Sequence, residues 1–273
     1  MNIINCANKI LKKHNLPTLL TYQILPISPT SGLLQIVENS ITIYEIHKRF
    51  DNFWQYFRAR KDDFSPRAVH RTFRGSVAVY SVVSFLLDVG DRHLENIMVT
   101  ETAEFFHIDY GFILGEEPFW KKAVGPKAPV RITQTMKEAI CFTSKDREEA
   151  FDQFIDICCE IYLVLRKHYA LFLNLLAYLH IARPKIDFSF TPEKVEEDLV
   201  ARFKLNYTDE DARRRFKDVF LASLKGNLAA TLHDISRSLK KEGTLAKLST
   251  SVTGVTSSVS EMVAKGLMAY WKQ

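Results

Sequence analysis

Two short polar motifs, separated by a hairpin pattern, constrain this chain more than any other feature. The motifs are residues 90–96 (GDRHLEN) and 107–111 (HIDYG). Between them stand two β-favouring runs, 97–99 and 105–106, divided by a polar stretch, and this arrangement predicts a β-hairpin. Because a hairpin brings the residues before its first strand next to those after its second, we expect Asn96 and Asp109 to lie close together.

An amide and a carboxylate at one place suit a hard divalent cation. Mg²⁺ accepts few protein ligands and completes its shell with water and phosphate oxygens. We therefore predict a magnesium site at Asn96 and Asp109. The alternative is that Asp91 and Asp109 only cap turns and that His93 is a surface residue.

The two motifs resemble the catalytic and metal-binding loops of the phosphatidylinositol 3- and 4-kinase superfamily, which includes the giant serine/threonine kinases. Members of this family read Asp-Arg-His, then Asn, then His-Ile-Asp-Phe-Gly, whereas ordinary protein kinases read His-Arg-Asp and Asp-Phe-Gly. This sequence has the family's order, with Tyr110 in place of Phe. The resemblance implies an α+β, protein-kinase-like fold of the phosphatidylinositol-kinase type. Its large lobe would be mostly helical, and a short sheet at the N-terminus would remain from the small lobe.

Residue periodicity predicts the elements of such a fold. A helix is expected from about residue 3 until Leu16-Pro17, and two strands at 22–25 and 33–37, divided by a turn region with Pro26, Pro29 and Gly32. A long helix starts after a capping Ser65 and ends before Gly90. Further helices are expected at about 133–142, 146–181 with a break near His168, 192–204 and 209–239.

These elements suggest three parts. Residues 1–38 would be the remnant of the small lobe and the hinge, 39–242 the helical large lobe, and 243–273 a flexible segment followed by an amphipathic helix. The last of these resembles the tail of class III phosphatidylinositol 3-kinases, which helps to regulate activity and to engage membranes. A helix packed back on the domain is the alternative.

The composition fits a cytoplasmic protein whose contact with membranes is peripheral. The chain has 273 residues, 47% of them hydrophobic and 25% charged, and a net charge of +5. Its four cysteines show no metal-ligand or disulfide spacing, which indicates reduced thiols. No apolar run is long enough to span a bilayer, so we expect no transmembrane segment and only peripheral contact with membranes. The resemblance implies that these are endomembranes, and we expect no nucleic-acid partner.

The resemblance also assigns roles within the two motifs. Asn96 and Asp109 would hold the Mg²⁺, or Mn²⁺ in its place, that bridges the ATP phosphates. His93 would assist deprotonation of the inositol hydroxyl, since its unperturbed pKa of about 6.5 is near the working pH. Asp91 would organise the catalytic loop or orient the acceptor. Arg92 would anchor the loop, and His107 would have a structural role.

Two further sets of residues follow from the same resemblance. The backbones of Gln35 and Val37 would bind the adenine of ATP above a floor made by Met98 and Ile108, although two buried strands explain the same pattern. In the loop that sets substrate choice, three lysines could meet one phosphodiester, which favours plain phosphatidylinositol; a solvated turn is the alternative. These lysines are Lys121, Lys122 and Lys127.

The front of the chain departs from the family pattern. The first glycine is Gly32, already at the expected hinge, so no glycine-rich phosphate cover precedes it, and Lys9, Lys12 and Lys13 fall on a predicted helix. The chain is therefore expected to be part of a longer kinase or a degenerate relative.

Three functions remain in competition. The leading one is a lipid kinase of the phosphatidylinositol 3-kinase type, closest to class III, with a regulatory subunit as a further partner. A phosphatidylinositol 4-kinase is the nearest alternative, because residues 107–114 and 128–133 also resemble that branch. A pseudokinase acting as a binding module is the other.

Overall fold

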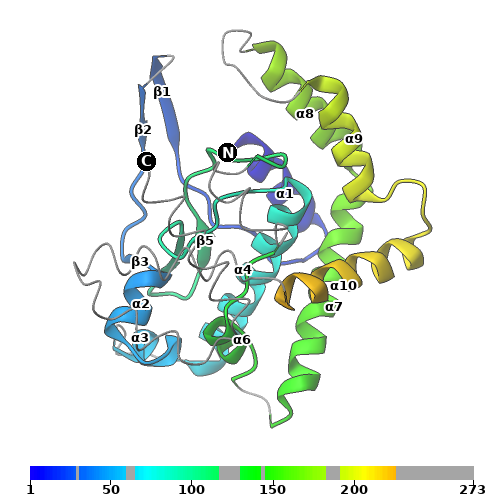
Figure 1. Ribbon diagram of the computed structural model, residues 1–273. Coiled ribbons are helices and arrows are strands. Elements are labelled where there is room, and N and C mark those ends of the chain that lie inside the picture. Colours follow the sequence, from blue (N-terminus) through cyan, green and yellow to red (C-terminus); the bar gives the residue numbers. More distant parts are fainter. Residues whose placement is uncertain (29–30, 60–64, 117–129, 143–144, 183–190, 226–273) are drawn as a thin grey trace, which may run out of the picture.

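The computed structural model describes residues 1–28, 31–59, 65–116, 130–142, 145–182 and 191–225 (Figure 1). Its helices are α1 (Asn2–Lys13), α2 (Ile43–Arg49), α3 (Phe53–Arg58), α4 (Pro66–Leu86), α6 (Gln134–Ile140), α7 (Arg147–Arg166), α8 (Tyr169–Ala182), α9 (Pro192–Phe203) and α10 (Asp209–Lys225). The strands are β1 (Ile24–Ser28), β2 (Ser31–Leu34), β3 (Ser40–Thr42), β4 (Ile97–Thr100) and β5 (Phe105–His107). The predicted α+β class is confirmed.

A three-stranded antiparallel sheet, in the order β3-β4-β5, carries the two polar motifs at its end. The β4–β5 hairpin is the one that the sequence predicts, and Ile97 pairs with His107 at its open end. Strand β3 was not predicted; it pairs with β4, with Thr42 opposite Met98. The sheet therefore joins the segment after the expected hinge directly to the hairpin of the candidate site.

Helix α4 is the central element of the helical body. Proline occupies its first turn as expected, but Ser65 at the N-cap position makes no side-chain capping hydrogen bond within the described residues. From Phe73 onward nearly every residue of α4 is buried, because β5, α6, α7 and α9 all pack against it. The helix thus ends inside the protein, where it leads into the first polar motif.

Helices α7 to α10 lie together to one side of the sheets (Figure 1). The predicted break near His168 is confirmed, because α7 ends at Arg166 and α8 begins at Tyr169. Tyr162 of α7 stacks on Phe216 of α10, with ring centroids 4.5 Å apart and planes only 7° from parallel. Thr191 and Thr208 accept hydrogen bonds from backbone N–H groups of the first turns of α9 and α10, as side-chain caps do.

The β1–β2 hairpin differs in detail from its prediction. Pro26 and Gly32 lie opposite each other within the ladder and not in the turn. A proline is tolerated there because each strand of a two-stranded hairpin is an edge strand. Both strands are exposed along their whole length, with Leu25 61% and Ile27 64% accessible, and in Figure 1 they extend away from the helices.

Helix α1 is confirmed, and it packs against α7. Lys9, Lys12 and Lys13 therefore lie on a helix and not on a strand, as the sequence predicts. Several expectations fall outside the described residues, namely Lys121, Lys122 and Lys127, the continuation of the last helix to 239, and the segment 243–273. Within the described part of the chain, no helix is both long and apolar enough to cross a bilayer.

Candidate active site

The open end of the β4–β5 hairpin brings the two motifs side by side. The Ile108 N–H donates to the Asn96 carbonyl at 3.1 Å, which continues the ladder by one bond beyond the pair Ile97 and His107. Asn96 and Asp109 therefore flank the same end of the hairpin, one on each strand's extension.

Asn96 is buried, and its side-chain nitrogen donates to the Asp91 carbonyl at 3.1 Å. An amide held by its nitrogen presents its oxygen, which is the atom a cation coordinates. This bond orients the Asn96 side chain and also holds the backbone of Asp91 in place.

Asp109 is exposed and stands in the left-handed region, with φ at 57°. Its Oδ1 accepts the Gly111 N–H at 3.0 Å, and a Cβ placed on Gly111 would lie 3.1 Å from the same oxygen. A side chain at position 111 would therefore push on the carboxylate. Because Gly111 has no side chain, its backbone N–H can approach the Asp109 carboxylate and orient it by a hydrogen bond.

Arg92 ties the two loops together from a buried position. Its Nε donates to the Gly90 carbonyl at 2.7 Å, and its Nη1 to the Ile108 carbonyl at 2.8 Å. Its Nη2 donates to the carbonyl of Asp109. One guanidinium therefore sets the distance between the loop of residues 90–96 and the backbone of Asp109, which fits the anchoring role expected for Arg92.

His93 is 3% accessible and lies beside Asp91. Its Nδ1 accepts the Glu95 N–H at 3.2 Å, so the neutral imidazole carries its hydrogen on Nε2. Nε2 is 3.7 Å from the Asp91 carboxylate. The imidazole and the carboxylate therefore lie side by side.

His107 is fully enclosed between α4 and the sheet. Its Nδ1 lies 3.2 Å from the Ser84 hydroxyl, and its ring packs on Tyr80 at 4.9 Å between centroids. Burial, and next the charge of Arg92, hold the pKa of His107 well below its ordinary value. These contacts fit the structural role expected for His107, which stays a prediction.

The residues expected around adenine lie along the path from β2 to the three-stranded sheet. The Gln35 N–H donates to the Gln23 carbonyl at 2.9 Å, and the Val37 carbonyl accepts the Ser40 hydroxyl at 2.7 Å. Neither of these two bonds uses the Gln35 carbonyl or the Val37 N–H. Met98 and Ile108 are partly buried against the core. Their contact with adenine remains a prediction.

The Asn96 amide and the Asp109 carboxylate fit an open Mg²⁺ site better than a site in which the protein supplies every ligand. Among the described residues, no three or more His, Cys, Asp or Glu side chains converge on a common point. A site with one amide and one carboxylate is of the kind that Mg²⁺ shares with phosphate oxygens. A cavity of about 260 Å³ lies at the opposite end of the ladder, beside Asn39 and Glu101, and is therefore separate from this site.

Several supporting residues carry no local sequence signal. Tyr22 donates from its hydroxyl to the His107 carbonyl at 3.4 Å and packs edge-on against Phe106. Ser84, in the last turn of α4, contacts His107, and Asp88, just after α4, pairs with Arg202. Such contacts join residues far apart in the chain, so only the fold reveals them.

Comparison with known proteins agrees with the motifs. The family model "Phosphatidylinositol 3- and 4-kinase" matches residues 50–190. The nodule isoform of phosphatidylinositol 3-kinase from Glycine max is 30% identical over 85% of this chain. Phosphatidylinositol 3-kinase VPS34 of Candida glabrata is 31% identical over 87% of it, and the protein of the same name from Saccharomyces cerevisiae is 30% identical over 87%.

The chain matches only a part of each of these proteins, namely 29%, 26% and 27% of their lengths. The family model nevertheless covers more than half of the chain, and its match includes both polar motifs and the helices around them. The expected kinase-like fold of the phosphatidylinositol-kinase type agrees with this match and with the helical body and small sheets described above. The chain therefore belongs to the phosphatidylinositol 3- and 4-kinase family.

Proposed function

We propose that this chain supplies the large-lobe chemistry of a lipid kinase, which transfers the γ-phosphate of ATP to an inositol hydroxyl of phosphatidylinositol. The observation that carries the proposal is the meeting of Asn96 and Asp109 at the open end of one hairpin, with Arg92 bonded to both loops. The relatives named above are phosphatidylinositol 3-kinases, which favours the 3-kinase type over the 4-kinase type.

In this proposal each residue of the site has a separate task. Asn96 and Asp109 hold Mg²⁺ or Mn²⁺, and the ion, when bound, neutralises charge on the ATP phosphates. Arg92 keeps the two ligand-bearing loops at a fixed separation. The acceptor's proton passes to the pair formed by His93 and Asp91, whose groups lie 3.7 Å apart.

Binding of the two substrates follows from the same arrangement. The Gln35 carbonyl and the Val37 N–H bind adenine, with Met98 and Ile108 below it. The exposed β1–β2 hairpin belongs to the sheet of a small lobe, which explains its accessible apolar side chains. The acceptor lipid places the protein at the surface of endomembranes, where a regulatory subunit would join it.

The test is a radiolabelled lipid-kinase assay on the full-length product of the gene, with phosphatidylinositol vesicles and chromatography of the deacylated lipid. We expect Asp109→Ala to abolish transfer and Glu104→Ala, which removes another carboxylate from the same hairpin, to leave it near the wild-type rate. Transfer at the wild-type rate by Asp109→Ala would remove the metal assignment. A wild-type protein that binds Mg·ATP but phosphorylates no inositol lipid would identify a binding module.

A further inference from the structure

An ion pair between α9 and the end of α4 lies next to the candidate site but touches none of its ligands. Arg202 of α9 donates to the carboxylate of Asp88 and, at 2.9 Å, to the Phe85 carbonyl. Its guanidinium also lies 5.6 Å from the centre of the Phe85 ring. The Asp88 side chain is 9% accessible and that of Arg202 is 23%, so water screens this pair only weakly.

Asp88 stands at the point where the two loops of the site meet. Its φ is 45°, a left-handed conformation that Asp adopts more readily than most residues. The Leu87 and Asp88 carbonyls accept the N–H groups of Leu114 and Gly115 at 2.9 and 3.4 Å, and the Gly90 N–H donates to the Phe112 carbonyl at 2.8 Å. The start of the catalytic loop and the segment after Asp109 are therefore bonded to each other on both sides of Asp88.

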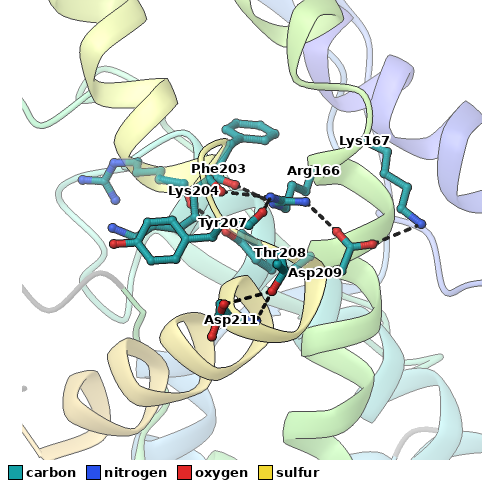
Figure 2. A network of polar contacts seen from close by, with 10 residues as sticks. Arg166, Lys167, Phe203, Lys204, Tyr207, Thr208, Asp209 and Asp211 are labelled. Carbon is teal, nitrogen blue, oxygen red and sulfur yellow. Dashed lines mark hydrogen bonds and ion pairs between the residues drawn. The ribbon is translucent and has the colours of Figure 1, made fainter.

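The residues that follow Arg202 are held by a second arginine, Arg166 (Figure 2). Arg166, at the end of α7, donates from Nε to the Phe203 carbonyl and from Nη2 to the Lys204 carbonyl, both at 2.9 Å. It also bonds the Tyr207 carbonyl and pairs with Asp209 at the start of α10 at 2.5 Å. The Tyr162 hydroxyl donates to the Arg202 carbonyl at 2.9 Å. The end of α9 is thus fixed to α7 and α10.

We propose that Arg202 is a positioning residue for phosphoryl transfer: held at the end of α9, it fixes Asp88 and thereby sets the relative position of the loop carrying Asp91 and the loop carrying Asp109. Residues of the proposed metal site need an accuracy of a fraction of an ångström, and they obtain it from groups that support their backbone. The effect on catalysis rests on the proposed function, whereas the mechanical link does not.

The test has one arm that needs no activity. Amide hydrogen exchange of residues 87–90 and 112–115 is compared in the wild type, Arg202→Met, Arg202→Lys and Asp88→Asn. Arg213→Met is the matched control, because it breaks the pair of Arg213 with Asp156 on an exposed surface of α10. We expect exchange in both segments to rise about 10-fold or more in Arg202→Met and Asp88→Asn, to be partly restored in Arg202→Lys, and to be unchanged in the control. Exchange that stays at the wild-type rate in Arg202→Met, or that rises equally throughout the protein, would overturn the proposal.

The second arm is the lipid-kinase assay on the full-length product. We expect Arg202→Met to lower kcat about 10-fold and to leave the KM for ATP within about twofold, because the bonds described above for Arg202 and Asp88 involve neither Gln35 nor Val37. Arg202→Lys should recover part of kcat. An unchanged kcat would contradict a positioning role. A wild-type protein without kinase activity would refute the proposed function, and the exchange arm would still decide the link between Arg202 and the two loops.

Discussion

Replacing Arg92 with methionine is the most direct test of how the site is held together. The guanidinium bonds three backbone carbonyls on two loops, and the residue is 7% accessible. A hydrogen bond from a charged donor contributes about 1.5–3 kcal/mol, and a buried acceptor left without its donor costs a similar amount. The two bonds of ordinary length, to Gly90 and Ile108, together correspond to about 3–6 kcal/mol.

We expect a smaller net loss, about 3 kcal/mol, because methionine fills most of the same volume and removes a charge that was costly to bury. In a domain of this size each kcal/mol lowers Tm by about 2–4 °C, so Tm should fall by about 6–12 °C. Urea unfolding followed by circular dichroism measures the free energy, and calorimetry measures Tm.

The matched control is Arg49→Met. Arg49 pairs with Glu45 on the surface of α2, where its side chain is 60% accessible, so the same substitution should cost less than about 0.5 kcal/mol. Equal losses in the two variants, or a loss below about 1 kcal/mol for Arg92→Met, would refute the argument that Arg92 joins the two loops. Arg92→Lys should fall between wild type and Arg92→Met, because one ammonium cannot reach three carbonyls at once.

Two other properties of the protein can be predicted from the structure. Burial depresses the folded-state pKa of His107, so below about pH 6.5 the unfolded chain binds more protons than the folded one, and the free energy of unfolding decreases as the pH is lowered, by at most about 1.4 kcal/mol per pH unit. His107→Asn should lack this contribution when unfolding is measured at pH 7.5, 6.5 and 5.5. Equal pH slopes in the variant and the wild type would contradict the assignment. The exposed hairpin should drive self-association, so Leu25→Ser with Leu33→Ser should reduce aggregation in light scattering while unfolding changes by less than about 0.5 kcal/mol, whereas an unchanged aggregation rate would show that other surfaces dominate.

The elements that the sequence predicts are those whose residues carry a local pattern. Helix α4 has a proline start and a long apolar run, and the β4–β5 hairpin has two β-favouring runs around a polar turn. Helix α3 gives no such pattern, because four of its six residues are buried aromatics, which leaves no polar face to mark a helical period. Strand β3 is only three residues long, and its pairing with β4 is a tertiary contact.

Within the candidate site, too, some residues can be predicted from a local sequence pattern and others cannot. The residues proposed to bind metal stand within two short motifs, so their spacing alone indicates their chemistry. Their supports do not, since Arg202 is 114 residues from Asp88 and Tyr22 is 85 residues from His107. A motif can show which groups would act, but the groups that hold them in place become visible only when distant helices are brought together.

The backbone of the two loops explains why such distant supports are needed. Asp88, Asp91, Asp109 and Leu114 all have φ between 45° and 57°, a region that costs a non-glycine residue of order 1 kcal/mol or more. Aspartate tolerates this region better than most side chains, and three of the four are aspartates. Local preference alone would still let the loops relax. Arg92 bonds one side of this strained segment and Arg202 the other, so one buried and one partly buried guanidinium group hold the carbonyls that they bind and keep the loops in this conformation.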